Sequence, residues 1–317
     1  LIVAGYSSSY ETTPNLRSFN FVAAQETHTL AFYASTGGIE GSIDYVEINR
    51  TDEDRSNFKK GFSVVGSVTR TPVAAGAELM GYSGFSPTNR LERFAGDEFA
   101  YGTGDFHVCG WVKFDTQNSY GALIHVTNTA GPNDDETVLS IYSGSTDTYV
   151  RAKTKSIRLT QAHAATVWRK FDVMRRDGIL FAFVDGALVG SLACPDDLTD
   201  AASSVYVGPY RITDAGFNAA PWMHIALLRN TKGSAPSPEQ IAYAYLEEEP
   251  MFQPNAKVTL KGASSVVNAV CHDTKAGTYY AGTPEGRSDF SGLIRVGQTD
   301  TPITTKIVAH DGMILEQ

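Results

Sequence analysis

Aromatic residues beside amide and acidic side chains, in turn-rich parts of the sequence, are the first candidates for chemistry. Sugar binding uses this combination, because a ring covers the apolar face of a sugar while amides and acids bind its hydroxyl groups. The candidate binding residues are Asn118, Tyr120, Asn133, Asp134, Tyr142, Tyr149, Tyr210, Asn218 and Trp222. Tyr120 and Tyr210 are the stronger candidates, since turn-forming residues flank them. Core packing is the favoured alternative for Tyr142 and Trp222.

Patterns typical of catalysis or of metal binding do not stand out in the sequence. The acidic clusters at 52–54, 134–136 and 196–197 fall in expected loops, which indicates solvated surface. The histidines show no His-x-x-x-His or His-Glu-x-x-His spacing, and there is no Gly-x-Ser-x-Gly elbow. A Ser-His-Asp triad leaves no spacing signature, so that alternative stays open. We predict no catalytic residue, no metal site and no cofactor, with Ca²⁺ held by oxygens of residues 131–136 as the alternative.

The composition argues against several classes of partner. A formal net charge of −9 and a pI of about 5.3 are unsuited to nucleic acid or to an anionic membrane surface. No run of about 18 apolar residues occurs, so no membrane insertion is expected. The 3 cysteines, Cys109, Cys194 and Cys271, are too few and too scattered for a disulfide framework or a zinc site. They are expected to be small buried hydrophobes, and the chain, which begins at Leu1, to be part of a longer protein.

The elements that would position the candidate residues are β-strands. Asp177-Gly178 and Asp185-Gly186 each lie between apolar runs, and Asp-Gly is the strongest short-range signal for a two-residue hairpin. They predict three consecutive antiparallel strands at 168–175, 179–184 and 187–192. The middle strand is apolar throughout, so both of its faces should be covered. Further strands are expected at 62–70, 106–114, 122–126, 138–142, 149–153, 204–208 and 222–229.

One helix is expected, near residues 238–248. Ser237 is a suitable N-cap, Pro238 suits the first helical position, and Gln240 completes a capping box. Strands at 257–260, 266–272, 278–281, 293–296 and 304–309 follow the helix. We therefore predict an all-β chain with a partial N-terminal β-sandwich module at 1–52, a linker and strand at 53–76, a sandwich at 77–252 and a C-terminal β module at 253–317.

Three pieces of sequence, in order, resemble the concanavalin A-like sandwich of the laminin-G-like type. They are residues 106–113, the hairpin run at 168–191, and residues 222–229 with 237–242. The resemblance implies a jelly-roll sandwich at 77–252. The pattern departs at His224 and Ala226, where acidic residues are usual, which weakens any metal or ligand inference there. Glycan-cleaving relatives carry a Glu-x-Asp-x-(x)-Glu strand, which this sequence lacks, so the resemblance implies a non-enzymatic domain.

The flanking segments resemble bacteriophage tail-fibre and tail-spike proteins. The matching pieces are residues 54–74, 79–86, 266–273, 280–287 and 304–312. This resemblance implies a virion adhesin, assembled in the host cytoplasm as a homotrimer with other virion proteins, that binds host surface polysaccharide through the sandwich. One alternative is a purely structural fibre or capsid-decoration module. Another is a polysaccharide-degrading enzyme that acts through Asp134 or Glu136.

Overall fold

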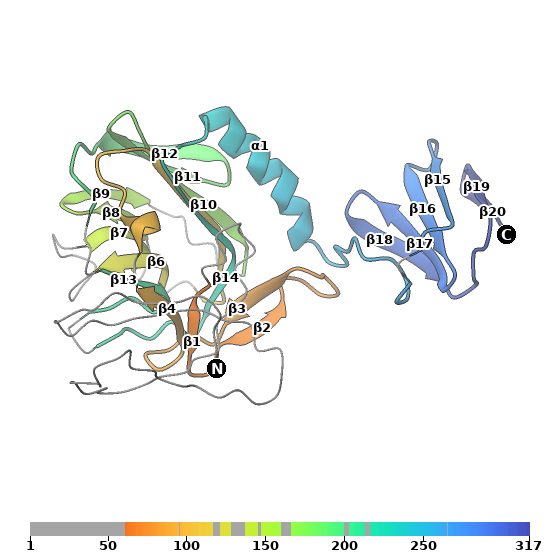
Figure 1. Ribbon diagram of the computed structural model, residues 1–317, viewed down its shortest axis with the longest axis horizontal. Coiled ribbons are helices and arrows are strands. Elements are labelled where there is room, and N and C mark those ends of the chain that lie inside the picture. The colour runs from red at the N-terminus through yellow and green to blue at the C-terminus, as the bar shows by residue number, and fades with distance from the viewer. Residues whose placement is uncertain are drawn as a thin grey trace, which may run out of the picture.

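The computed structural model describes residues 61–94, 96–116, 121–127, 137–144, 147–159, 166–199, 203–212, 216–264 and 266–317. The expected N-terminal module at 1–52 lies outside these residues, and so do Asn118, Tyr120, Asn133, Asp134 and the alternative calcium segment at 131–136. The described residues form a two-sheet sandwich followed by a smaller C-terminal β module (Figure 1). The predicted all-β sandwich with one short α-helix is confirmed.

Two seven-stranded antiparallel sheets form the sandwich. Sheet A contains, in spatial order, β1 (Ser63–Val65), β4 (Arg90–Phe94), β13 (Ser204–Gly208), β6 (Gly121–Thr127), β7 (Thr137–Ser143), β8 (Thr148–Ala152) and β9 (Lys155–Leu159). Sheet B contains β12 (Ala187–Ala193), β11 (Ile179–Val184), β10 (Arg169–Arg176), β5 (Phe106–Phe114), β14 (Met223–Lys232), β3 (Met80–Ser83) and β2 (Thr69–Pro72). Non-consecutive strands are therefore neighbours in both sheets.

The hydrophobic core lies between the sheets and follows from the two-residue alternation of side chains. Phe106, Val108, Val112 and Phe114 of β5 belong to this core, as the sequence pattern predicts. Gly110 shares their face, and a Cβ there would lie 2.8 Å from a methyl carbon of Leu123 in sheet A. A larger residue at this position would therefore force the Leu123 side chain to move.

The predicted run of three hairpin strands is confirmed as β10, β11 and β12. Both Asp-Gly pairs turn with positive φ at each residue, at 52° and 75° for Asp177 and Gly178 and at 51° and 78° for Asp185 and Gly186. This geometry matches the right-handed twist of the strands that it connects. The turns set the pairing of three of the seven strands of sheet B through local sequence, with one β-bulge between Ala182 and Phe183.

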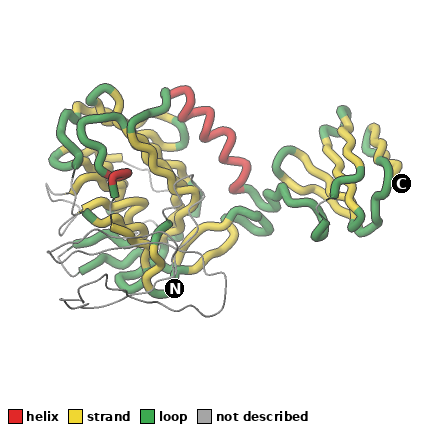
Figure 2. Tube along the Cα trace, viewed as in Figure 1, coloured by secondary structure: helices red, strands yellow, loops and turns green. Residues whose placement is uncertain are grey.

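Helix α1 (Pro238–Glu248) covers the outer face of sheet B, and its bounds are those that the sequence predicts (Figures 1 and 2). The capping box is present, since Ser237 Oγ accepts the Gln240 N–H while Gln240 Oε1 accepts the Ser237 N–H. Ile241 is buried against Met174 and Phe183 of the strands below. The apolar middle strand, β11, is therefore covered on both faces.

The sequence predicts that the sandwich begins at residue 77, but in the structure it begins earlier. The single strand expected at 62–70 is divided at Gly66, which has a φ of +69°. Its two parts join different sheets, because β1 pairs with β4 while β2 pairs with β3. The described part of the expected linker, residues 61–76, is therefore integral to both layers.

The C-terminal module contains one four-stranded sheet and a separate hairpin (Figure 1). The sheet is β15 (Ala269–Asp273), β16 (Thr278–Thr283), β17 (Gly286–Ser291) and β18 (Ile294–Thr299), and the hairpin is β19 (Ile307–His310) and β20 (Met313–Glu316). The strand expected at 257–260 is absent, and β17 and β20 are additional to the prediction. Across the described residues, no helix has the length and apolar character needed to cross a membrane.

Candidate functional site

Four of the expected binding residues lie together at one end of sheet A. Tyr142 and Tyr149 are register partners across β7 and β8. The next pair along these strands, Ile141 and Val150, points into the core, so the tyrosine pair is on the outer face. Tyr210, from the connection between β13 and β14, packs against Tyr142 and Ala122. We call Tyr142, Tyr149 and Tyr210 the tyrosine cluster.

The rings of the tyrosine cluster contact one another directly. Tyr142 stacks on Tyr149 with centroids 5.3 Å apart and an interplanar angle of 20°. Tyr210 meets Tyr142 edge-on, with centroids 5.4 Å apart. Tyr142 and Tyr210 are each only 8% exposed, and Tyr149 is partly exposed. The cluster is therefore a packed aromatic surface whose most accessible ring is Tyr149.

Asn218 and His125 flank Tyr210 and each presents an N–H donor. Asn218 Oδ1 accepts the Tyr210 backbone N–H at 2.7 Å, which leaves its amide nitrogen as a donor. His125 Nδ1 lies 3.2 Å from the Arg211 backbone nitrogen, which donates to it. Burial, assisted by the charge of Arg211, lowers the pKa of His125 to about 3, so the neutral ring carries its proton on Nε2. Within the described part of the chain, neither Asn218 Nδ2 nor His125 Nε2 has a hydrogen-bond partner.

Cationic side chains border the tyrosine cluster. Arg158 is the register partner of Tyr149, and its Nε donates to Asp147 Oδ2 at 2.9 Å. Burial raises the pKa of Tyr142 above its ordinary value of 10, although the charge of Arg151 lowers it in part. The Tyr142 hydroxyl is therefore protonated at neutral pH and can donate as well as accept a hydrogen bond.

Trp222 lies on the same β13–β14 connection, with 48% of its side chain exposed. Its carbonyl accepts the Asp115 N–H at 2.9 Å, at the end of β5. The sequence favours Tyr210 as an accessible binding residue and core packing for Trp222. In the structure Tyr210 is buried and Trp222 is exposed. Met223 is the reason for the difference, because it occupies the buried position at the start of β14 and leaves Trp222 in the preceding turn.

His125 and Ser140 belong to this site but are not among the predicted residues. They are register partners on β6 and β7, both are 0% exposed, and Ser140 Oγ has no partner in the described structure. A histidine inside the apolar run of β6 was a usable signal, because a buried polar group needs a partner. The sequence could not show that it lies near Tyr210.

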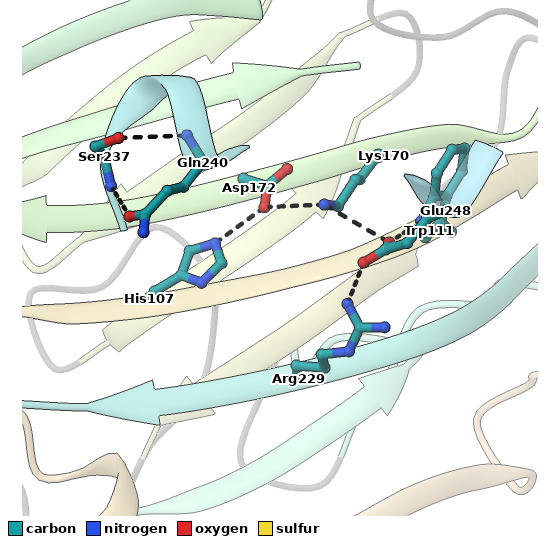
Figure 3. A network of polar contacts seen from close by, with 8 residues as sticks. All are labelled: His107, Trp111, Lys170, Asp172, Arg229, Ser237, Gln240 and Glu248. Atoms are coloured by element: carbon teal, nitrogen blue, oxygen red, sulfur yellow. Dashed lines mark hydrogen bonds and ion pairs between the residues drawn. The ribbon is translucent and has the colours of Figure 1, made fainter. Parts of the chain in front are cut away.

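A second polar cluster lies beneath α1 on the outer face of sheet B (Figure 3). Lys170 Nζ lies 3.6 Å from Glu248 Oε2 and 3.7 Å from Asp172 Oδ1, and Lys170 and Asp172 are 1% and 0% exposed. Glu248 also accepts the Trp111 Nε1–H at 2.7 Å and pairs with Arg229. These contacts join the C-terminal end of α1 to three strands of sheet B.

Comparisons with known proteins return solved structures alone. No protein-family model matches the chain, and no curated protein matches its sequence. A structure concerned with the interaction of botulinum neurotoxin type C with two ganglioside molecules is 14% identical, covers 80% of this chain and 61% of its own, and has a TM-score of 0.46. The binding domain of Paraclostridial Mosquitocidal Protein 1 is 11% identical over 81% of this chain and 68% of its own, with a TM-score of 0.49. A Trypanosoma rangeli sialidase is 13% identical over 60% of this chain and 30% of its own, with a TM-score of 0.45.

These matches correct one expectation. They are clostridial binding domains and a sialidase rather than phage fibres, so the assignment to the tail-fibre and tail-spike proteins is wrong. The virion location and the homotrimer rested on that resemblance and lose its support. The chain spans only 61% of the length of the neurotoxin type C structure, and the function is argued below from its own residues.

Proposed function

We propose that this protein binds carbohydrate, without cleaving it, at the tyrosine cluster. The observation that carries the proposal is the convergence of three tyrosine rings with two N–H donors that lack partners among the described residues. Sugar sites combine these features, because a sugar has an apolar face for a ring and hydroxyl groups for polar atoms. Buried polar groups are nearly always hydrogen-bonded, so unpartnered donors favour a polar ligand.

Each component has a distinct role in this proposal. Tyr149, the accessible ring, would stack on the sugar, while Tyr142 fixes its orientation from below. Both donor atoms are buried in the unliganded structure, so Asn218 Nδ2 and His125 Nε2 would donate to hydroxyl or carbonyl oxygens of the ligand only when the side chains that cover them move aside. Neutral His125 suits this role, since it keeps one ring N–H as a donor at physiological pH.

The described surroundings of the cluster favour binding over hydrolysis. Hydrolysis by the common glycosidase mechanisms needs two carboxyl groups about 5–10 Å apart across the scissile bond. Asp147 is the carboxylate next to Tyr149 in the described strands, and it is held by Arg158. A carboxylate neutralised in this way is poorly suited to accept or donate a proton.

The direct test is an array of immobilised saccharides probed with the whole chain, followed by titration of the bound saccharides. Tyr149→Ala and Asn218→Ala should each weaken binding by on the order of tenfold, the size of one lost stacking or hydrogen-bond contact. Tyr243→Ala is the matched control, because Tyr243 is 64% exposed on α1 and distant from the cluster in sequence. Binding of no saccharide would refute the function, and unchanged affinity in both site variants would refute the location.

A further inference from the structure

Three potential metal ligands of different chemical types lie together on the outer face of sheet B. His107 and Cys109 are two residues apart on β5, so both point away from the core residues Phe106 and Val108. Asp172 on β10 is the register partner of Cys109. The alternation of two strands and their register therefore bring a nitrogen, a sulfur and an oxygen donor side by side.

The donor atoms are close enough to share one ion. The ligand atoms of His107, Cys109 and Asp172 all lie within 4.8 Å of one another. His107 Nε2 lies 2.9 Å from Asp172 Oδ1, and Figure 3 draws this contact as a dashed line. Cys109 and Asp172 are buried, at 2% and 0% exposure, and His107 is partly exposed. The group is thus a largely dry site with one ligand at its edge.

One carboxylate oxygen of the group takes part in none of the surrounding ion pairs. Asp172 Oδ1 faces both His107 and Lys170, but Asp172 Oδ2 has no hydrogen-bond partner among the described residues. A buried carboxylate oxygen without a partner destabilises the folded chain, because it has lost its hydration without a compensating hydrogen bond. A bound cation would satisfy it.

We propose that His107, Cys109 and Asp172 bind one transition-metal ion of the zinc class. Zinc accepts imidazole nitrogen, thiolate sulfur and carboxylate oxygen, and three protein ligands leave a fourth position for water. Calcium and magnesium fit poorly, because they prefer all-oxygen sites.

Binding exchanges a proton for the metal. Cys109 is buried, and burial disfavours the free thiolate, so without a metal its sulfur holds a proton. The metal replaces that proton, which leaves to solvent, and His107 binds through Nε2 with its own proton on Nδ1. Thiolate and carboxylate together balance the two charges of the ion.

The positive charge of Lys170 repels a metal ion at Asp172, and the carboxylate of Glu248 reduces this repulsion. Lys170 Nζ lies 3.6 Å from Glu248 Oε2, so the ammonium group keeps an anionic partner when Asp172 turns to the metal. Arg229, the register partner of Cys109 on β14, is likewise paired with Glu248.

The test is a cobalt titration of the whole chain after chelator and reductant have been removed. Cobalt bound through a thiolate gives a near-ultraviolet charge-transfer band, and tetrahedral cobalt gives visible bands. We expect both with one ion per chain, and we expect zinc to abolish them by displacement. Absence of the charge-transfer band in the unmodified chain would overturn the proposal without any variant.

Variants assign the ligands. Cys109→Ser should abolish the charge-transfer band, while Cys194→Ser, which replaces another buried free thiol, should leave it unchanged. Asp172→Asn should weaken cobalt binding at least tenfold. His107→Gln, at the edge of the site, should do the same with little effect on folding. A band that persists in Cys109→Ser, or affinity that is unchanged in both His107→Gln and Asp172→Asn, would refute the site.

Discussion

Replacement of Glu248 by glutamine would remove one charge from the network beneath α1 and keep the size of the side chain. Trp111 Nε1 donates to this carboxylate at 2.7 Å, and exchanging a charged acceptor for a neutral one costs about 1 kcal/mol. Lys170 is 1% exposed and would keep only Asp172, at 3.7 Å, which costs roughly 1–2 kcal/mol. Arg229 is half exposed, so its ion pair adds at most about 0.5 kcal/mol.

We therefore expect Glu248→Gln to lower the free energy of unfolding by about 3 kcal/mol at pH 7. A loss of this size would lower the Tm by roughly 6–12 °C. Tryptophan fluorescence during urea unfolding is a suitable measurement, because all 3 tryptophans, Trp111, Trp168 and Trp222, lie within the sandwich. The C-terminal module contributes no tryptophan to the signal.

The pH dependence gives a second check on the same variant. Burial would raise the pKa of Glu248, but the hydrogen bonds from Trp111 and Arg229 hold it below its ordinary value of 4.5. Because its folded-state pKa is lowered, ionised Glu248 contributes its full stabilisation above about pH 4.5. This stabilisation is lost as the pH falls through the folded-state pKa. The difference between wild type and Glu248→Gln should therefore shrink in acid.

Glu247→Gln is the matched control, since Glu247 is exposed on the same turn of α1. It should change stability by less than about 0.5 kcal/mol. A Glu248→Gln variant no less stable than this control would refute the view that the network holds α1 on sheet B.

Gly186→Ala should destabilise the sandwich by more than Gly178→Ala, as measured by urea unfolding. Both have φ near +75°, and strain alone costs roughly 1 kcal/mol, but a Cβ at Gly186 would also lie 3.2 Å from Tyr245 Cβ of α1. In the C-terminal module, the N–H groups of Gly312 and of the turn after β15 lower the pKa of Asp273 to about 2. Amide exchange of this module should therefore accelerate as the pH falls from about 4 to 2, after correction for intrinsic exchange, and Asp273→Asn should remove that dependence.

Each of these predictions has a clear contrary result. Equal losses in the two glycine variants would show that α1 does not pack against the 185–186 turn. Amide exchange that keeps the same pH dependence in Asp273→Asn would show that this carboxylate does not hold the C-terminal hairpin.

Local signals in the sequence determined the hairpins, the central strand and the helix. The Asp-Gly pairs need only positive φ at neighbouring residues, and the capping box of α1 spans four residues, so neither depends on distant contacts. The alternation in β5 likewise specifies which side chains face the core. The same signals failed at 62–70, because division at Gly66 between two sheets depends on β3 and β4.

The two candidate sites could be identified only from the tertiary structure. Tyr210 and Trp222 exchanged their expected exposures because the position of Met223 relative to sheet B decides which side chain enters the core. Nothing in the sequence links Cys109 to Asp172, yet strand register makes them partners on neighbouring strands. Trp111 and Glu248 are separated by 137 residues and meet only when α1 docks on sheet B. Residue types and alternation are local properties, whereas register and helix docking are set by the packing of distant segments.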